Sequence, residues 1–405
     1  MRRPAALAVA IAALLLVDLT TIVVRTGGTP APTRSVGTQT GPSALELAAG
    51  RWERIPTPPI RLCNPITANA GNDLYVVEYG EPPCAPAAAV FDSVTDSWVT
   101  LPTPPGLGPT PFVVWGGFRL VVVAHGGATF SYDPISGKWQ ELAPLPGKFT
   151  AGYNTIDLLW TGQEVLANVQ PDQLGSRGGM LTYALSTRGW TRVAYLPTAP
   201  RQLVDAPMVV YNARVYAWVS KGARYAPSRP SGMSYRRQLP ELRRLDGSRW
   251  TLVGTSAAGP LSDLRLTATT KGIFVDGATC PLGVPCTQQI AQAVIVDPAS
   301  PGHVATVLPP EQRMPIEYDV AADQSTVVFT YPNGSRAWGT ILLPPVPQSP
   351  APGTTVIYDI ARGAWLTGPT APTTLRSMVE TFWTSDGVVL LNTNGNGGWL
   401  LRAGP

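Results

Sequence analysis

The sequence predicts an all-β chain that is built from one repeated unit. Its composition joins 43 Pro and 40 Gly to only 14% charged residues, a mixture that suits short strands and tight turns better than solvated helices. The clearest example of the unit is residues 111–146, PFVVWGGFRLVVVAHGGATFSYDPISGKWQELAPLP. It reads as two apolar β-runs, a break at Gly126-Gly127, a third strand ending near Tyr132, a turn, and a fourth strand with Trp139.

The same order of strands recurs along the rest of the chain. The stretches that follow it, numbered here as units one to seven, are 66–105, 111–146, 157–197, 207–254, 265–310, 318–372 and 381–405. Unit five lacks the Trp, and unit seven stops one strand short. The segment Arg51–Pro56 matches the missing Trp-containing strand but has no unit before it. We therefore expect this N-terminal strand to complete unit seven. That pairing closes a ring of seven four-stranded blades and removes the open sheet edges that promote aggregation.

Each unit has the residues that a buried blade needs. The first two strands are continuous runs of Val, Leu and Tyr, as expected for strands that are covered on both faces. The Trp of each fourth strand is expected to pack between neighbouring units. We therefore interpret the Trp series as core residues and not as an aromatic binding surface.

At these spacings Gly126, Gly127, Tyr132 and Trp139 resemble the kelch motif of β-propellers. The resemblance implies an all-β, seven-bladed kelch-like β-propeller over residues 51–405, with the N-terminal strand closing the last blade. It does not imply one function, because propellers host binding modules, scaffolds and enzymes alike.

Kelch-type propellers include a copper oxidase similar to galactose oxidase, whose site needs two His, two Tyr and a Tyr–Cys crosslink. The two His of this chain, His125 and His303, fall in units two and five, so we expect no metal and no cofactor. Asp133, Asp297 and Asp359 each precede a turn, where capping of that turn explains them. With other catalytic motifs absent as well, no catalytic residue is predicted, and the enzyme question stays open with a preference for a non-enzyme.

The N-terminus carries a candidate membrane anchor. Two arginines precede an apolar run from Ala5 to Val24, which spans about 30 Å as a helix. A positive start with no Ala-x-Ala site after the run predicts an uncleaved signal anchor, one transmembrane helix within residues 1–25. Asp18 inside the run keeps the alternative open, which is a secreted protein whose signal peptide is cut near Gly28.

On either reading the rest of the chain is extracytoplasmic. Residues 26–50, rich in Thr, Pro, Gly and Ser, are predicted to be a disordered linker. They would hold residues 51–405 at the cell membrane as the C-terminal domain of a single-pass protein.

The four Cys fit an oxidising compartment. Cys280 and Cys286 bracket a short Pro/Gly loop that a disulfide would close, which leaves Cys63 and Cys84 as the second pair. In an up-and-down unit, the connection into the first strand and the connection between the second and third strands lie on one face. Cys63 and Cys84 are therefore expected to meet on that loop face. A zinc site is not predicted, because no Cys-x-x-Cys spacing occurs.

The net charge of +4 is concentrated in unit four. Residues 221–249 hold eight basic and two acidic side chains, a net charge of 8 − 2 = +6. Guanidinium groups suit phosphate or carboxylate, so we hypothesise an anion-binding patch on the loop face; the alternative is a solvated loop. The candidate ligand-binding residues are Arg224, Arg229, Arg236, Arg237, Arg243 and Arg244.

The sequence thus favours a membrane-anchored, extracytoplasmic propeller that acts as a non-catalytic binding or scaffolding module. Through its loop face it would recognise an envelope protein or an anionic envelope polymer or glycan. We expect a monomer, and no nucleic-acid partner outside the cytoplasm. The alternative is an envelope glycan-active enzyme or lectin that uses the same face.

Overall fold

The structure is a computed structural model. It describes residues 41–63, 65–80, 84–108, 111–124, 126–147, 156–170, 179–196, 204–221, 240–256, 262–279, 290–307, 319–330, 353–372, 379–392 and 397–405. All of these belong to one compact unit, Gln39–Pro405. The apolar run Ala5–Val24 lies outside them, so its transmembrane helix stays a prediction. Within the described ranges, no helix is both long enough and apolar enough for a membrane crossing.

Regular structure in the described residues is almost entirely β, as predicted. Units one, two, five and six each form a four-stranded sheet whose strands pair in chain order. The strands of units one and two are β2 (Pro65–Ala70), β3 (Asp73–Glu78), β4 (Ala87–Asp92), β5 (Ser97–Leu101), β6 (Phe112–Trp115), β7 (Leu120–Val123), β8 (Thr129–Asp133) and β9 (Lys138–Leu142). Those of units five and six are β19 (Ser262–Thr269), β20 (Gly272–Thr279), β21 (Ile290–Val296), β22 (Val304–Thr306), β23 (Asp319–Ala322), β24 (Thr326–Thr330), β25 (Thr355–Asp359) and β26 (Ala364–Thr367).

Units three and four share one nine-stranded sheet. Its strands are β10 (Ile156–Trp160), β11 (Val165–Val169), β12 (Met180–Ser186), β13 (Gly189–Leu196), β14 (Val204–Asp205), β15 (Met208–Tyr211), β16 (Arg214–Lys221), β17 (Glu241–Asp246) and β18 (Arg249–Thr255). The strands of unit three and those of unit four are antiparallel among themselves. Between the two units, β13 and β18 pair in parallel through a single register pair, Tyr195 with Arg249.

The first and last strands of the described chain lie in one sheet. β1 (Arg51–Ile55) pairs with β29 (Gly397–Arg402), which continues to β28 (Gly387–Asn392) and β27 (Val379–Thr384). The register sets Trp52 opposite Leu401 and Arg54 opposite Trp399. The prediction that the Trp52 strand completes the C-terminal unit is confirmed.

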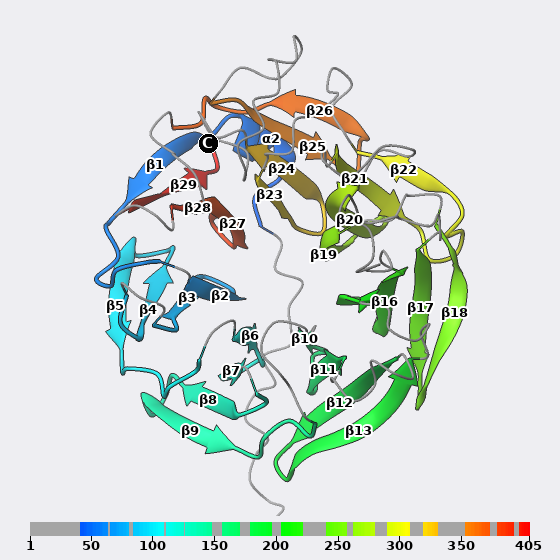
Figure 1. Ribbon diagram of the computed structural model, residues 1–405. Helices are drawn as coiled ribbons and strands as arrows, with labels where there is room; N and C mark the ends of the chain where they lie inside the picture. The colour runs from blue at the N-terminus through cyan, green and yellow to red at the C-terminus, as the bar shows by residue number, and fades with distance from the viewer. Residues whose placement is uncertain are drawn as a thin grey trace, which may run out of the picture. The chain divides into compact units, whose positions relative to one another are not determined.

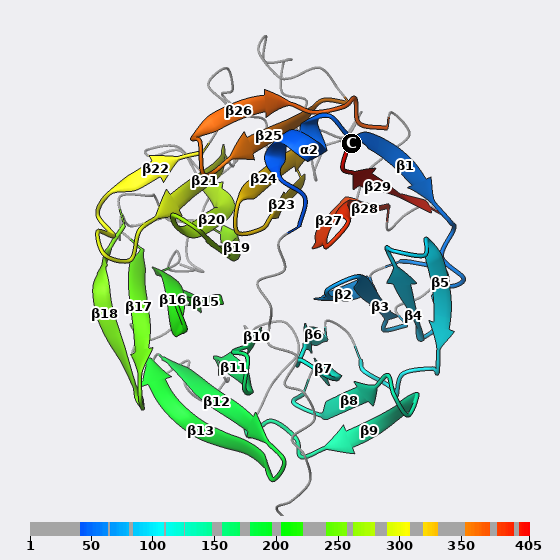
Figure 2. The same ribbon diagram turned by 180° about the vertical axis from the view of Figure 1, so that it is seen from behind.

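The sheets follow one another in chain order around a ring, and the first strand of each unit is the innermost (Figures 1 and 2). Neighbouring sheets bury hydrophobic side chains against each other. Tyr75 of unit one and Leu120 of unit two share one cluster. At the ring closure, Leu74 of unit one packs with Val389 and Leu400 of unit seven. Radial sheets packed in this way form a β-propeller.

Five fourth-strand tryptophans tie their unit to the preceding one, in agreement with their predicted packing between units. Their indole N–H groups donate to a Thr hydroxyl or a Pro carbonyl of the preceding unit, at 2.8–3.1 Å. The pairs are Trp52–Thr355, Trp98–Pro56, Trp139–Pro102, Trp190–Thr129 and Trp250–Thr182. An indole combines a large apolar ring with one N–H donor, and in these five pairs the acceptor belongs to another unit, so the bond also holds two units together.

Residues 44–48, which the sequence analysis assigned to the linker, form the helix α2 (Ala44–Ala48). Ser43 Oγ accepts from the backbone N–H of Glu46, and the Glu46 carboxylate accepts from the backbone N–H of Ser43. This reciprocal arrangement is a capping box. Leu47 is fully buried against units six and seven. The folded part therefore begins before Arg51, where the sequence analysis had set its start.

The alternating strand directions give the ring two faces. The turn face carries the tight turns that join the first strand to the second, and the third to the fourth, in each unit. The insert face carries the connections between second and third strands and the steps from one unit to the next. The strands that flank residues 222–239, 280–289 and 331–352 end on the insert face.

Candidate functional site on the insert face

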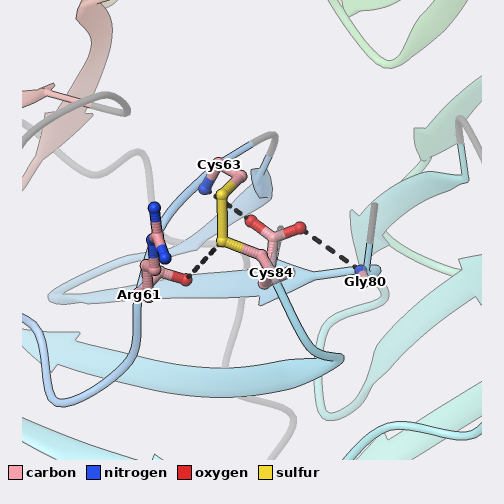
Figure 3. The surroundings of a disulfide bond; sticks show 5 residues. Arg61, Cys63, Gly80 and Cys84 are labelled. Carbon is pink, nitrogen blue, oxygen red and sulfur yellow. Dashed lines mark hydrogen bonds between the residues drawn. A yellow bond between two sulfur atoms is a disulfide. The ribbon is translucent and has the colours of Figure 1, made fainter. Parts of the chain in front are cut away.

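A disulfide joins two connections of unit one on the insert face. Cys63 lies just before β2 and Cys84 just before β4, and their sulfur atoms are bonded at 2.03 Å with a Cα–Cα distance of 6.1 Å. The pairing agrees with the sequence prediction. Figure 3 shows the disulfide between Cys63 and Cys84, with Arg61 and Gly80 beside it. The second predicted pair, Cys280 and Cys286, lies outside the described residues.

The carboxylate of Glu78, the last residue of β3, organises the backbone around this bridge. Its Oε2 accepts a hydrogen bond from the Cys63 N–H at 2.8 Å, and its Oε1 accepts from the Gly80 N–H at 3.3 Å. The side chain is fully buried, which would be costly without such partners. Glu78 thus fixes the chain on both sides of the disulfide. Each of its two carboxylate oxygens accepts a backbone hydrogen bond in this role.

Arg243, a candidate anion-binding residue, is instead part of a buried ion pair. Its guanidinium contacts Oε2 of Glu241 through Nη2 at 2.6 Å and through Nε at 2.8 Å. The side chains are only 16% and 11% exposed. Nη1 also donates to the Trp250 carbonyl at 3.4 Å. This arginine is therefore engaged within unit four.

Arg244 makes the equivalent pair on the other side of the strand. Its Nε and Nη2 donate to the two carboxylate oxygens of Asp246 at 2.7 and 2.9 Å. This bidentate bond raises the pKa of Arg244 above its ordinary value and lowers that of Asp246. The structure therefore does not gather Arg243 and Arg244 into an open patch. The other four candidates, Arg224, Arg229, Arg236 and Arg237, lie outside the described residues.

A buried chain of hydrogen bonds joins unit three to unit four. The Trp250 indole donates to Thr182 Oγ1 at 2.8 Å, and Thr182 donates to Asn168 Oδ1 at 3.2 Å. Asn168 Nδ2 then donates to the Ala206 carbonyl at 3.0 Å. Asn168 and Thr182 are fully buried. These polar groups hold two units in register and do not present atoms to a ligand.

Several carboxylates that the sequence pattern did not single out lie in strands near the insert face. Besides Glu78 and Glu241, they include Asp276 in β20 and Asp157 in β10. Oδ2 of Asp157 accepts from the backbone N–H of Met208 at 2.6 Å, which joins unit three to unit four. The available signal was an acid within an apolar β-run, as in DLYVVE of β3. In the described part of the chain, no group of three or more His, Cys, Asp or Glu is placed to hold a metal ion.

The turn-face aspartates behave as predicted. Asp133, Asp297 and Asp359 each accept a hydrogen bond from a backbone N–H two or three residues further along, at 2.8–3.0 Å. The capping interpretation is confirmed. Of the two His, His303 is exposed in the turn of unit five, and His125 lies outside the described residues.

No protein-family profile matches the chain. No curated protein matches it. Solved structures do match. The β-propeller domain of Cps50 (Swd1) from Myceliophteria thermophila is similar with a TM-score of 0.50 and 12% identity, over 86% of this chain and 99% of that one.

Two enzymes are similar over comparable lengths. A fungal alcohol oxidase of the AA5 family, in complex with copper, has a TM-score of 0.57 and 12% identity, over 88% of this chain and 77% of that one. An oligogalacturonate lyase in complex with manganese has a TM-score of 0.54 and 12% identity, over 88% of this chain and 98% of that one. At this identity the similarity establishes the fold alone, which is the β-propeller.

Proposed function

We propose that this chain is a membrane-anchored, extracytoplasmic binding or scaffolding propeller that recognises a protein or an anionic envelope component through its insert face. The observation that carries the proposal is the uneven distribution of chain length. Residues 222–239, 280–289 and 331–352 all connect second and third strands, so three long connections begin and end on the insert face. Loops held by a rigid scaffold are where binding usually occurs.

The disulfide also favours the insert face as the binding surface. The Cys63–Cys84 bridge and Glu78 fix the insert-face connections of unit one. A fixed connection loses less conformational entropy on binding than a free one. Anion recognition is assigned to the arginines of the insert itself, Arg224, Arg229, Arg236 and Arg237, because Arg243 and Arg244 are already paired with carboxylates.

We assign the propeller to the kelch type, with seven blades. In unit two, Gly126 and Gly127 both have positive φ, 94° and 90°, in the region that favours glycine. The rings of Tyr132 and Trp139 lie 5.3 Å apart. The nine-stranded sheet counts as two blades, because a single residue pair joins its halves. A hydrophobic cluster between each pair of neighbouring units supports the same count.

The proposed location of the chain, anchored in the membrane with its propeller outside the cytoplasm, rests on two features. The apolar run Ala5–Val24 follows two arginines, which favours a single-pass anchor within residues 1–25 and a linker up to α2. A structural disulfide is typical of extracytoplasmic proteins. Secretion after cleavage remains the alternative location.

The proposal is tested by capture from cells that express the full-length protein. The variant R224A/R229A/R236A/R237A removes four charges from the insert. The matched control, R188A/R192A/R214A/R249A, removes four exposed arginines from turns and outer strands. We expect at least a tenfold loss of the crosslinked partner in the first variant and no loss in the control. Equal capture by both variants would show that the insert is a solvated loop.

A direct measurement separates the two ligand classes. Purified full-length protein is titrated with polyphosphate and polyglutamate as anionic probes, and with neutral dextran. Binding of the anions that weakens with salt and with the insert variant supports an anionic polymer as ligand. Capture of a protein without polyanion binding supports a protein partner.

A second candidate is an envelope glycan-active enzyme or lectin. The carboxylates of Glu78, Asp157 and Glu241 near the insert face are each engaged by protein groups, so this candidate rests on the propeller fold, which an oxidase and a lyase share. If neither capture nor polyanion binding occurs, a screen of envelope glycans for binding and turnover becomes the deciding experiment.

A further inference from the structure

The described chain begins on the turn face, opposite the inserts. β1 starts there, because its end at Ile55 leads to the insert face, and α2 precedes it. The backbone of Gly41 lies so close to the Trp383 indole that a side chain there would overlap the ring. Trp383 is near the end of β27, just before a turn of the turn face. The N–H of Gly404 donates to the Glu46 carbonyl at 2.7 Å, so both ends of the described chain are fixed on this face.

Exposed apolar side chains gather on the same face. Those with the largest exposure are Ile135, at 93%, and Phe118, at 62%, which occupy the two turns of unit two. The exposed large apolar residues of the described chain are Leu45, Val94, Val99, Phe118, Ile135, Tyr195 and Leu252. Four of them lie in α2 or in turns of the turn face, and the other three lie on outer strands. Among the described residues, Tyr195, near the insert-face end of β13, is the one member of this group that lies close to the insert face.

The two tight turns of unit two hold Phe118 and Ile135, called the tips of unit two below, in fixed positions. Ile135 follows Asp133, whose carboxylate accepts the Ile135 N–H at 2.9 Å and a hydrogen bond from the Ser136 hydroxyl. Phe118 follows Gly117, which has φ of 82° in a tight turn. The two turns are two strand spacings apart, about 10 Å. An Ile side chain that is almost fully exposed by a closed turn has no role in the core of this propeller.

Basic groups accompany both tips. The Arg119 guanidinium lies 5.3 Å from the centre of the Phe118 ring, and Lys138 is exposed at the start of β9, directly after the turn of Ile135. Apolar tips with flanking cations are typical of groups that enter the headgroup region of a bilayer. Asp133, in the same turn as Ile135, is engaged by that turn: hydrogen bonds from the Ser136 hydroxyl and from the Ile135 N–H lower its pKa.

We propose that the turn face docks on the membrane surface, with Phe118 and Ile135 inserted among the lipid headgroups, so that the insert face is presented away from the membrane. This inference rests on the proposed anchor. The apolar run Ala5–Val24 is followed by residues 26–40, which span at most about 50 Å when extended. A tether of this length that joins the ring on the turn face raises the effective concentration of that face at the bilayer.

The test uses the full-length protein in phosphatidylcholine–phosphatidylglycerol vesicles. A photo-crosslinking phenylalanine analogue replaces Phe118 or Ile135, and as matched controls Val99 or Leu252, which are 55% and 50% exposed on outer strands. We expect lipid adducts, detected by mass spectrometry, to be at least tenfold more abundant at 118 and 135 than at 99 and 252. The melting temperatures of the four variants should agree, which shows that each is folded.

Equal lipid adducts at all four positions would overturn the docking, and so would adducts to a second copy of the chain in place of lipid. A carbonate wash separates this inference from the proposed function. If the chain stays in the vesicles but positions 118 and 135 give no lipid adduct, the docking is wrong and the anchor stands. If carbonate releases the chain, the proposed membrane anchor is wrong, and the docking that rests on this anchor is wrong as well.

Discussion

The two faces of the ring are made from the same strands but differ in how their connections are built. On the turn face the connections are short, and side chains such as Asp133 and Asp359 close them. On the insert face the connections of units four, five and six are long, and in units one and three buried groups such as Glu78 and Asn168 brace the strand ends. The turn face therefore carries short, closed turns and both ends of the described chain, while the insert face carries the connections whose length differs between units.

The largest expected effect comes from removing α2 and β1, which enter the ring from the turn face and close it. A chain that starts at residue 62 lacks α2 and β1, and so loses the buried side chains of Leu47 and Ile55. Each such side chain contributes about 1.5–3 kcal/mol, and β29 is left as an open edge. Because domains are stable by only about 5–15 kcal/mol, we expect this chain to be unfolded or aggregated.

Size-exclusion chromatography and circular dichroism measure this outcome. The control starts at Gln39, where the compact unit begins, and should elute as a folded monomer. A folded, soluble chain from residue 62 would show that pairing of β1 with β29 is dispensable, and that the ring is held by its other interfaces.

On the insert face, the corresponding change is the double variant C63S/C84S. The bridge joins residues 21 apart, and loss of such a crosslink costs about 3 kcal/mol. Urea unfolding should show a lower midpoint. Amide exchange should become faster near Cys63 and Gly80, and stay unchanged at Gly137, whose N–H donates to Asp133 on the turn face. Equal acceleration on both faces would mean that the bridge stabilises the whole ring and not one face.

A smaller effect is expected for the buried hydrogen-bond chain of units three and four. W250F removes the bond to Thr182 inside the protein, and should cost about 1.5–3 kcal/mol. The matched change W98F removes a bond to the Pro56 carbonyl that is exposed, and should cost less. If the two variants unfold at the same urea concentration, the buried chain adds nothing beyond tryptophan packing.

Much of the scaffold could be predicted because it depends on local pattern. Continuous apolar runs identify second strands such as Leu120–Val123, and the spacing of Cys63 and Cys84 in an up-and-down unit predicts their bridge. The helix α2 was missed, although Ser43 and Glu46 have the spacing of a capping box. Its threonine- and proline-rich surroundings hid the signal.

The insert face was harder to predict. The sequence pattern predicts Arg243 and Arg244 as ligand-binding groups, and the structure shows each paired with an acid two residues away, Glu241 and Asp246, on the same side of its strand. This i,i+2 spacing was a usable signal for the ion pairs. By contrast, the partners of Glu78 could not be predicted, because they depend on where the connections of unit one meet in space.

The smallest expected effects concern two aspartates of the turn face, Asp323 and Asp133. Their contributions to the free energy of unfolding should change with pH in opposite directions. Burial raises the pKa of Asp323, against the opposing hydrogen bonds from Ser325 and Thr326. Its ionised form therefore destabilises the fold, and the free energy of unfolding falls as the pH rises from about 4 through the pKa of the folded state. D323N keeps an amide oxygen for the same donors, so it should gain stability relative to the native chain at pH 7, by no more than about 1 kcal/mol, and this gain should vanish near pH 4.

D133N is the matched variant for D323N, and its stability should change with pH in the opposite direction. Hydrogen bonds from Ser136 and from the Ile135 N–H lower the pKa of Asp133, so its ionised form stabilises the fold at neutral pH. D133N should be less stable than the native chain at pH 7, and the difference should shrink as the pH falls below about 4. Melting temperatures at pH 3–8 measure both variants. Parallel curves would show that neither turn depends on charge, and that the turn face is held by its backbone alone.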